Sequence, residues 1–206
     1  MEVRLPDGTA VSLNQGSTLE YNRHFNRKAR EVLLSGVAYF DVARDESKPF
    51  IVDTDPIRVT VLGTAFTVDA SDPQKEIQVV VDRGKVVMQQ TRNKHQVILT
   101  PGETGVWHPE GAILEEHAAK DPNYIAWKTG KITFDETPLE TCIRTLSKVY
   151  HIRIKLQDND IRQCRVTATF DNEPLDTVLE VLSTILQAEI SRSDDMYLIS
   201  GSGCSG

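Results

Sequence analysis

The sequence lacks most features of an enzyme or of a nucleic-acid-binding protein. Cysteine occurs only 3 times in 206 residues, and aromatic residues make up 6%. The 30 acidic residues outnumber the 23 Lys and Arg residues, which gives a formal charge of -7. Nonspecific nucleic-acid binding needs clustered cations to replace phosphate counterions, so this balance argues against a direct nucleic-acid partner.

Long hydrophobic runs are also missing. The longest strongly apolar stretch, residues 178–190, is interrupted by Glu180, Gln187 and Glu189. It therefore falls short of the roughly 20 apolar residues that a transmembrane helix needs. A strand-like pattern begins almost at the first residue, with no signal peptide before it. Taken by itself the chain would stay in the cytosol, but we interpret it as a soluble truncation of a longer protein.

Titratable side chains do not gather into a pattern typical of catalysis. No glycine-rich nucleotide loop and no serine-nucleophile elbow is present. The histidines lie in turn-like or polar sequence without metal-ligand spacing, and we expect them to be solvent-exposed: His24, His95, His108, His117 and His151. We therefore expect no enzyme activity, no cofactor and no metal. The enzyme alternative would be a hydrolase with a metal held inside a double-stranded β-helix.

The first part of the chain alternates apolar and polar residues with a period of two, which indicates β-strands. Examples are the runs 57–61, 66–68 and 77–81. Turn signals such as Asp7-Gly8 and Pro101-Gly102 separate these runs, and no helical period appears. The pattern predicts an all-β domain over residues 1–119, either a sandwich or a solenoid-like arrangement.

The pattern changes near Asp121-Pro122, where a 36-residue repeat begins. Residues 134–141 recur as residues 170–177, and each copy reads as a strand, a turn and a helix with proline in its first turn. The apolar spacing of both helices is that of a single buried face. We predict a small α+β domain over residues 120–200, with a duplicated β-α-β unit and both helices on one face of a small sheet. Residues 201–206 are predicted to form a disordered tail.

The cysteines leave two interpretations open. Cys142 shares the apolar face of its helix, and Cys164 shares the apolar face of its strand, so both are expected to be small buried side chains. Because both point into the same core, a disulfide between Cys142 and Cys164 is geometrically allowed. Cys204, in the predicted tail, is given no role.

One basic cluster, residues 23–30, stands out in the acidic chain. We expect it to form a flexible hairpin loop with its charges in water. The alternative is a contact with an anionic partner or a membrane surface.

The first part of the chain resembles the FecR domain. The resemblance lies in an ordered series of motifs: Leu5-Pro6-Asp7-Gly8-Thr9, Gly36-x-Ala38-Tyr39-Phe40-Asp41-Val42, Pro49-Phe50-x-Val52, Val61-Leu62-Gly63-Thr64-x-Phe66-x-Val68 and Leu99-x-Pro101-Gly102-Glu103. The chain has Val37 where the family usually has glutamate, so a role for that carboxylate is not carried over.

The second part resembles the C-terminal domain that follows FecR modules, opening with Trp127-x-x-Gly130-x-Ile132-x-Phe134. That domain is similar to the STN and secretin short domains. The resemblance implies the periplasmic region of a single-pass inner-membrane anti-sigma factor. Such a region would sense the N-terminal signalling domain of a TonB-dependent outer-membrane transporter. An extracytoplasmic-function sigma factor would be held by a cytosolic segment outside this chain.

Signalling by contact requires a docking surface, and a sheet edge can provide one by strand addition. Chain-terminal strands often lie at edges. We therefore predict that Met196, Tyr197, Leu198 and Ile199 bind the partner, with the tyrosine as anchor. The alternative is that this strand only forms core. A different function, binding of carbohydrate or cell wall by a β-sandwich, is weakened by the few aromatic side chains available for stacking on sugars.

Overall fold

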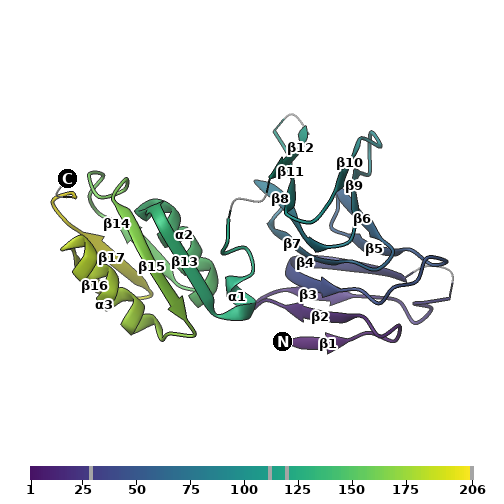
Figure 1. The fold of residues 1–206 in the computed structure, drawn as a ribbon, viewed down its shortest axis with the longest axis horizontal. Helices are drawn as coiled ribbons and strands as arrows, with labels where there is room; N and C mark the ends of the chain where they lie inside the picture. Colours follow the sequence, from purple (N-terminus) through teal and green to yellow (C-terminus); the bar gives the residue numbers. More distant parts are fainter. Residues whose placement is uncertain (28–29, 111–112, 119–120, 205–206) are drawn as a thin grey trace. The chain divides into compact units, whose positions relative to one another are not determined.

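The computed structural model describes residues 1–27, 30–110, 113–118 and 121–204 (Figure 1). The chain forms two compact units, Met1–Asp121 and Pro122–Gly206. In the described residues, no helix has the length and apolar character that crossing a bilayer would require.

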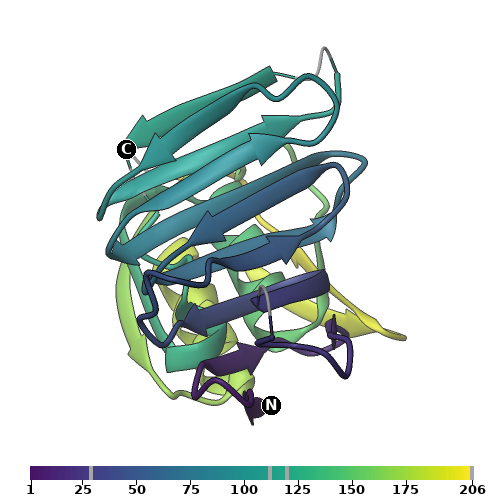
Figure 2. The same ribbon diagram turned by 90° about the vertical axis from the view of Figure 1, so that its right-hand side faces the viewer.

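The first unit is built from strands. Its strands are β1 (Glu2–Arg4), β2 (Ala10–Leu13), β3 (Thr18–Glu20), β4 (Arg30–Asp41), β5 (Phe50–Asp53), β6 (Ile57–Val61), β7 (Ala65–Asp72), β8 (Glu76–Arg83), β9 (Val86–Gln90), β10 (Gln96–Leu99), β11 (Glu103–His108) and β12 (Ile113–Ala118). They run side by side across Figure 2. The hydrogen-bonded path is β10-β9-β6-β5-β4-β7-β8-β11-β12, with β2 and β3 also paired to β4.

Strand β4 joins two halves of this sheet. Its first half pairs with β3 and β5, and its second half pairs with β2 and β7. Between the halves lies Gly36, whose φ of +102° suits a residue without a Cβ. A Cβ there would lie 2.5 Å from the Ser17 hydroxyl, which accepts a hydrogen bond from the Val37 N–H. The Gly-x-Ala-Tyr-Phe motif therefore marks the place where one long strand changes partners.

The two halves enclose one apolar core. Alternate residues of β4, β5, β6 and β9 are buried, and β7 and β8 also bury consecutive residues; Phe40 and Phe66 are fully buried. The ends of the path, β10 and β12, are in contact, so the sheet is nearly closed. The expectation of an all-β domain is confirmed. The sheet is one continuous path, however, and not the two separate sheets of a sandwich.

Arg30 corrects the expected solvent exposure of the basic cluster. Arg23, His24 and Arg27 are exposed, and residues 28–29 lie outside the described residues, but Arg30 is only 1% exposed. Its guanidinium donates to Asp7 Oδ2 at 3.0 Å, to Ala43 O at 2.6 Å and to Lys48 O at 2.9 Å. It also lies 5.6 Å from the centre of the Phe50 ring. This buried cation ties the Asp7-Gly8 turn to β4.

The second unit combines helices with two small sheets. Its elements are α1 (Ala126–Thr129), β13 (Lys131–Pro138), α2 (Leu139–Tyr150), β14 (Arg153–Leu156), β15 (Arg165–Asp171), α3 (Leu175–Leu186), β16 (Glu189–Ser193) and β17 (Met196–Ser200). Strands β13 and β15 pair antiparallel. The second sheet has the order β14-β17-β16, with β14 parallel to β17.

The 36-residue spacing is visible in the backbone. Glu136 and Asn172 both have positive φ before a helix, and His151 and Gln187 both end a helix in the left-handed conformation. The strand expected after each helix is present, but the sheet arrangement differs from the expectation. The two leading strands pair with each other, and the strands after the helices form a separate sheet. The single small sheet that we predicted is therefore wrong.

The core of this unit is shared by both helices and both sheets. Cys142 and Leu146 from α2 and Val178 and Leu182 from α3 are fully buried, and Ile199 from β17 lies in the same cluster. Cys142 and Val178, like Leu146 and Leu182, are equivalent positions of the 36-residue repeat, and both members of each pair are fully buried. This fixes the helices over the strands and leaves the outer edges of the sheets to solvent.

Candidate partner-binding surface

Strand β17 is not a sheet edge. It is hydrogen-bonded to β14 on one side and to β16 on the other, so its backbone groups are already paired. The prediction that Met196, Tyr197, Leu198 and Ile199 form an edge for strand addition is therefore wrong. A final strand can reach the middle of a sheet because β14, contributed some forty residues earlier, pairs with it in parallel.

The four residues alternate between the two faces of the sheet. Ile199 is fully buried and belongs to the core, as the alternative interpretation of this strand required. Tyr197 is half-buried and lines a cavity between α3 and β16. Met196 and Leu198 lie on the opposite face because successive strand residues point to opposite sides. Of the predicted set, only Tyr197 reaches the cavity.

The edges of this sheet are β14 and β16. Strand β14 carries exposed Arg153 and Lys155, and cationic side chains are a common protection of sheet edges against pairing. Strand β16 is exposed along most of its length, and only Ile190 is half-buried. The α3 cavity lies directly beside β16. Of the two edge strands, β16 is the one that lines this cavity.

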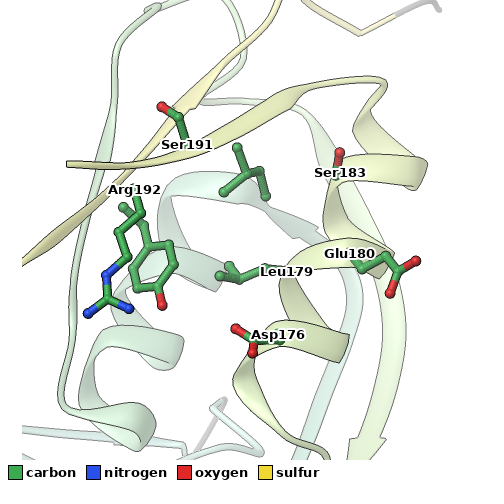
Figure 3. Close-up of a pocket in the computed structure, with 8 residues that line it drawn as sticks. Asp176, Leu179, Glu180, Ser183, Ser191 and Arg192 are labelled. Carbon is green, nitrogen blue, oxygen red and sulfur yellow. The ribbon is translucent and has the colours of Figure 1, made fainter.

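The cavity has a volume of about 290 Å³ and combines an apolar floor with charged walls (Figure 3). It is lined from α3 by Asp176, Leu179, Glu180 and Ser183, and from β16 and β17 by Ile190, Ser191, Arg192 and Tyr197. Leu179 is buried and Ile190 packs against the core, so these two side chains supply the floor. Figure 3 shows Asp176 on the side of α3 that faces the strands, Arg192 on the strand wall, and the Glu180 side chain extending from α3 away from Arg192.

The charges of the cavity are not balanced internally. The Arg192 guanidinium lies 5.6 Å from the centre of the Tyr197 ring, and its Nε donates to the Asp194 carbonyl oxygen at 3.5 Å. Asp176 and Glu180 are both exposed on α3, four residues apart. In the part of the chain that the structure describes, neither carboxylate forms an ion pair. The helix wall therefore presents two uncompensated negative charges.

The disulfide of this unit joins Cys164 and Cys204, with 5.6 Å between the Cα atoms. The allowed bond between Cys142 and Cys164 is therefore not formed, and Cys204 takes the place of Cys142. The tail prediction is also wrong for residues 201–204, since the Gly201 N–H donates to Asp158 Oδ2 at 3.0 Å. Residues 205–206 lie outside the described residues.

Cys142 is a free thiol in the core, as the other interpretation of the cysteines held. Burial raises its pKa to about 12, because the apolar surroundings disfavour the thiolate. Its Sγ lies 3.6 Å from the Thr137 carbonyl oxygen, to which it can donate. Because the thiolate is the reactive form, this burial lowers the nucleophilicity of Cys142.

The other candidate residues do not converge on a reactive site. His24, His95 and His151 are exposed and His108 is half-buried, while His117 has no described side chain. Within residues 1–27, 30–110, 113–118 and 121–204, no group of His, Cys, Asp and Glu side chains could hold a metal ion.

Sequence reasoning missed the helix wall of the cavity. Leu179 belongs to the apolar face of α3 and was interpreted as core only. Glu180 was noted only as an interruption of the apolar stretch 178–190, and Asp176 was given no role. Their spacing of four residues placed them on one helix face. The sequence did not show that β16 would lie opposite them.

Two family models match the chain, one for each unit. The model described as FecR protein matches residues 1–87, and the model described as FecR, C-terminal, matches residues 131–199. The chain belongs to the FecR family. The family models thus cover Gly36 of β4 in the first unit and, in the second, the elements from β13 to β17 except Ser200.

Solved structures resemble this FecR-family chain along its length. Two crystal structures of a candidate anti-sigma factor from Parabacteroides distasonis ATCC 8503 each match with a TM-score of 0.78 and 29% sequence identity. One match covers 100% of this chain and 95% of the other, and the second covers 98% and 94%. No curated protein resembles the chain closely enough to count as a relative. These matches support a role in anti-sigma factor signalling.

Proposed function

We propose that this FecR-family chain is the periplasmic signalling region of a transmembrane anti-sigma factor. It receives the signal from a TonB-dependent outer-membrane transporter and regulates an extracytoplasmic-function sigma factor. The observation that carries the proposal is the match of both units to FecR models, together with the likeness of the whole chain to a candidate anti-sigma factor.

The partners follow from this assignment. The direct partner is the N-terminal signalling domain of the transporter, which contacts the chain in the periplasm. The sigma factor is held by a cytosolic segment, and a single helix anchors the protein in the inner membrane, both outside residues 1–206. The chain itself contacts neither nucleic acid nor membrane.

The physical properties of the chain suit a contact signal. The described residues form no metal cluster, and the one free cysteine is a buried, protonated thiol. The β16 edge and the cavity beside it provide backbone groups, an apolar floor and unbalanced charge. These are the elements of a protein-protein docking surface.

A binding panel tests the proposed function. The 206-residue chain is immobilised and titrated with the purified N-terminal signalling domains of all TonB-dependent transporters encoded in the source genome. We expect saturable 1:1 binding by one domain or a small subset, measured by biolayer interferometry. Heat-unfolded chain is the control surface. If every signalling domain gave the same response on native and unfolded chain, the proposal would be refuted.

A further inference from the structure

The outward backbone groups of β16 can be assigned from its hairpin. Two residues, Asp194 and Asp195, separate the paired residues Ser193 and Met196. In such a hairpin the flanking residues form a hydrogen-bonded pair, and hydrogen-bonded pairs alternate from there along the ladder. Ile190 and Arg192 therefore direct their N–H and C=O groups away from β17 and toward solvent.

The same stretch of β16 forms one wall of the cavity. Ile190 packs against the core and Arg192 stacks on Tyr197, so both side chains lie on the face that meets α3. A strand added at this edge would place alternate side chains over the cavity, because its pleat continues that of β16. An apolar side chain on that strand would meet Leu179, Ile190 and the Tyr197 ring.

The charge around this surface selects a basic occupant. Asp176 and Glu180 lie on the helix wall without a cationic partner in the described chain. Exposed Asp194 and Asp195 close one end of β16, and exposed Glu189 lies at the other. Arg192 is the one cation lining the cavity. A strand carrying Lys or Arg next to its apolar residue would complement this field.

We propose that the α3–β16 groove, meaning the outward edge of β16 and the cavity lined by α3, binds one extended strand of the transporter's signalling domain. The strand extends the β14-β17-β16 sheet by hydrogen bonds to Ile190 and Arg192. An apolar side chain enters the cavity, and a neighbouring Lys or Arg contacts Asp176 and Glu180. This inference rests on the proposed function and adds to it the surface and the chemistry of recognition.

The backbone contribution is tested with Arg192→Pro and the matched control Arg192→Ala. Both variants lose the guanidinium, but only the proline variant also loses the outward N–H. The probe is the signalling domain that binds the parent chain in the panel. We expect R192P to weaken Kd at least tenfold relative to R192A, because the two variants differ in the outward N–H. Circular dichroism of each variant checks that the unit is folded.

The charge contribution is tested with Glu180→Lys and the control Asp135→Lys. Asp135 is exposed on β13, in the other sheet. We expect E180K to weaken binding five- to tenfold and to reduce its dependence on salt, and D135K to change neither. If R192P fails to fold, the comparison of E180K with D135K tests whether the signalling domain binds the groove.

Two negative results have different meanings. Binding of the parent chain with Kd unchanged by both R192P and E180K would overturn the groove and leave the proposed function standing. Absence of binding by the parent chain to every signalling domain would overturn the proposed function, and the groove as a transporter site with it.

Discussion

Replacing Arg30 with methionine is expected to lower the free energy of unfolding of the first unit by about 3–5 kcal/mol. Arg30 is 1% exposed and pairs at 3.0 Å with Asp7, which is 4% exposed. Without the guanidinium, the Asp7 carboxylate is left buried and uncompensated, and three backbone carbonyls lose a donor. Urea denaturation measures the effect. In a Trp127→Phe background, the fluorescence of buried Trp107 reports on this unit alone.

The matched control for this prediction is Arg83→Met. Arg83 pairs with Asp41 at 2.7 Å, but the two side chains are 66% and 51% exposed. Exposed ion pairs contribute at most about 1 kcal/mol to stability. The free energy of unfolding of R83M should therefore lie close to that of the parent chain. Equal losses of unfolding free energy in R30M and R83M would contradict this interpretation, because they would show that burial does not strengthen the Arg30–Asp7 pair.

Replacing Cys204 with serine is expected to destabilise the second unit by about 4 kcal/mol, the chain-entropy contribution of a disulfide closing a loop of this length. The bond joins residues 40 apart. It holds the end of β17 to the segment that enters β15, so both sheets are affected by its loss. Thermal unfolding followed by Trp127 fluorescence in a Trp107→Phe background measures the change, and a reducing agent should reproduce it in the parent chain.

Cys142→Ala is the control for the disulfide. It removes the free thiol and leaves the Cys164–Cys204 bond, so its unfolding should still respond to reductant, whereas that of C204S should not. Thiol titration of the denatured, unreduced chain should find one thiol. Three thiols, or a loss of the reductant response in C142A, would contradict the pairing.

Local patterns predicted many of the strands and the two long helices, but not α1. Alternation in the first unit predicted its strands, and the 36-residue repeat predicted α2, α3 and the strands around them. The burial of Arg30 was missed because a charged residue in a basic cluster is normally solvated. Its spacing from Val32 and Leu34, two and four residues on, did place it on the core face of β4.

Pairings between distant segments could not be predicted in the same way. The position of β17 between β14 and β16 depends on a parallel contact across about forty residues, which no local pattern encodes. Cys204 was set aside because glycine and serine surround it, yet the disulfide orders that segment. For the groove, Tyr197 was the one predicted residue that reached the site. The helix wall could be recognised only after β16 had been placed beside α3.

We propose that the second unit recognises the transporter through the face formed by β16 and α3. Hydrogen–deuterium exchange of the full 206-residue chain, with and without the signalling domain selected by the panel, tests it most directly. We expect slowed exchange at residues 189–193 and 175–186, with exchange in residues 1–121 unchanged. Protection confined to residues 1–121, with β16 exchanging as in the free chain, would contradict it.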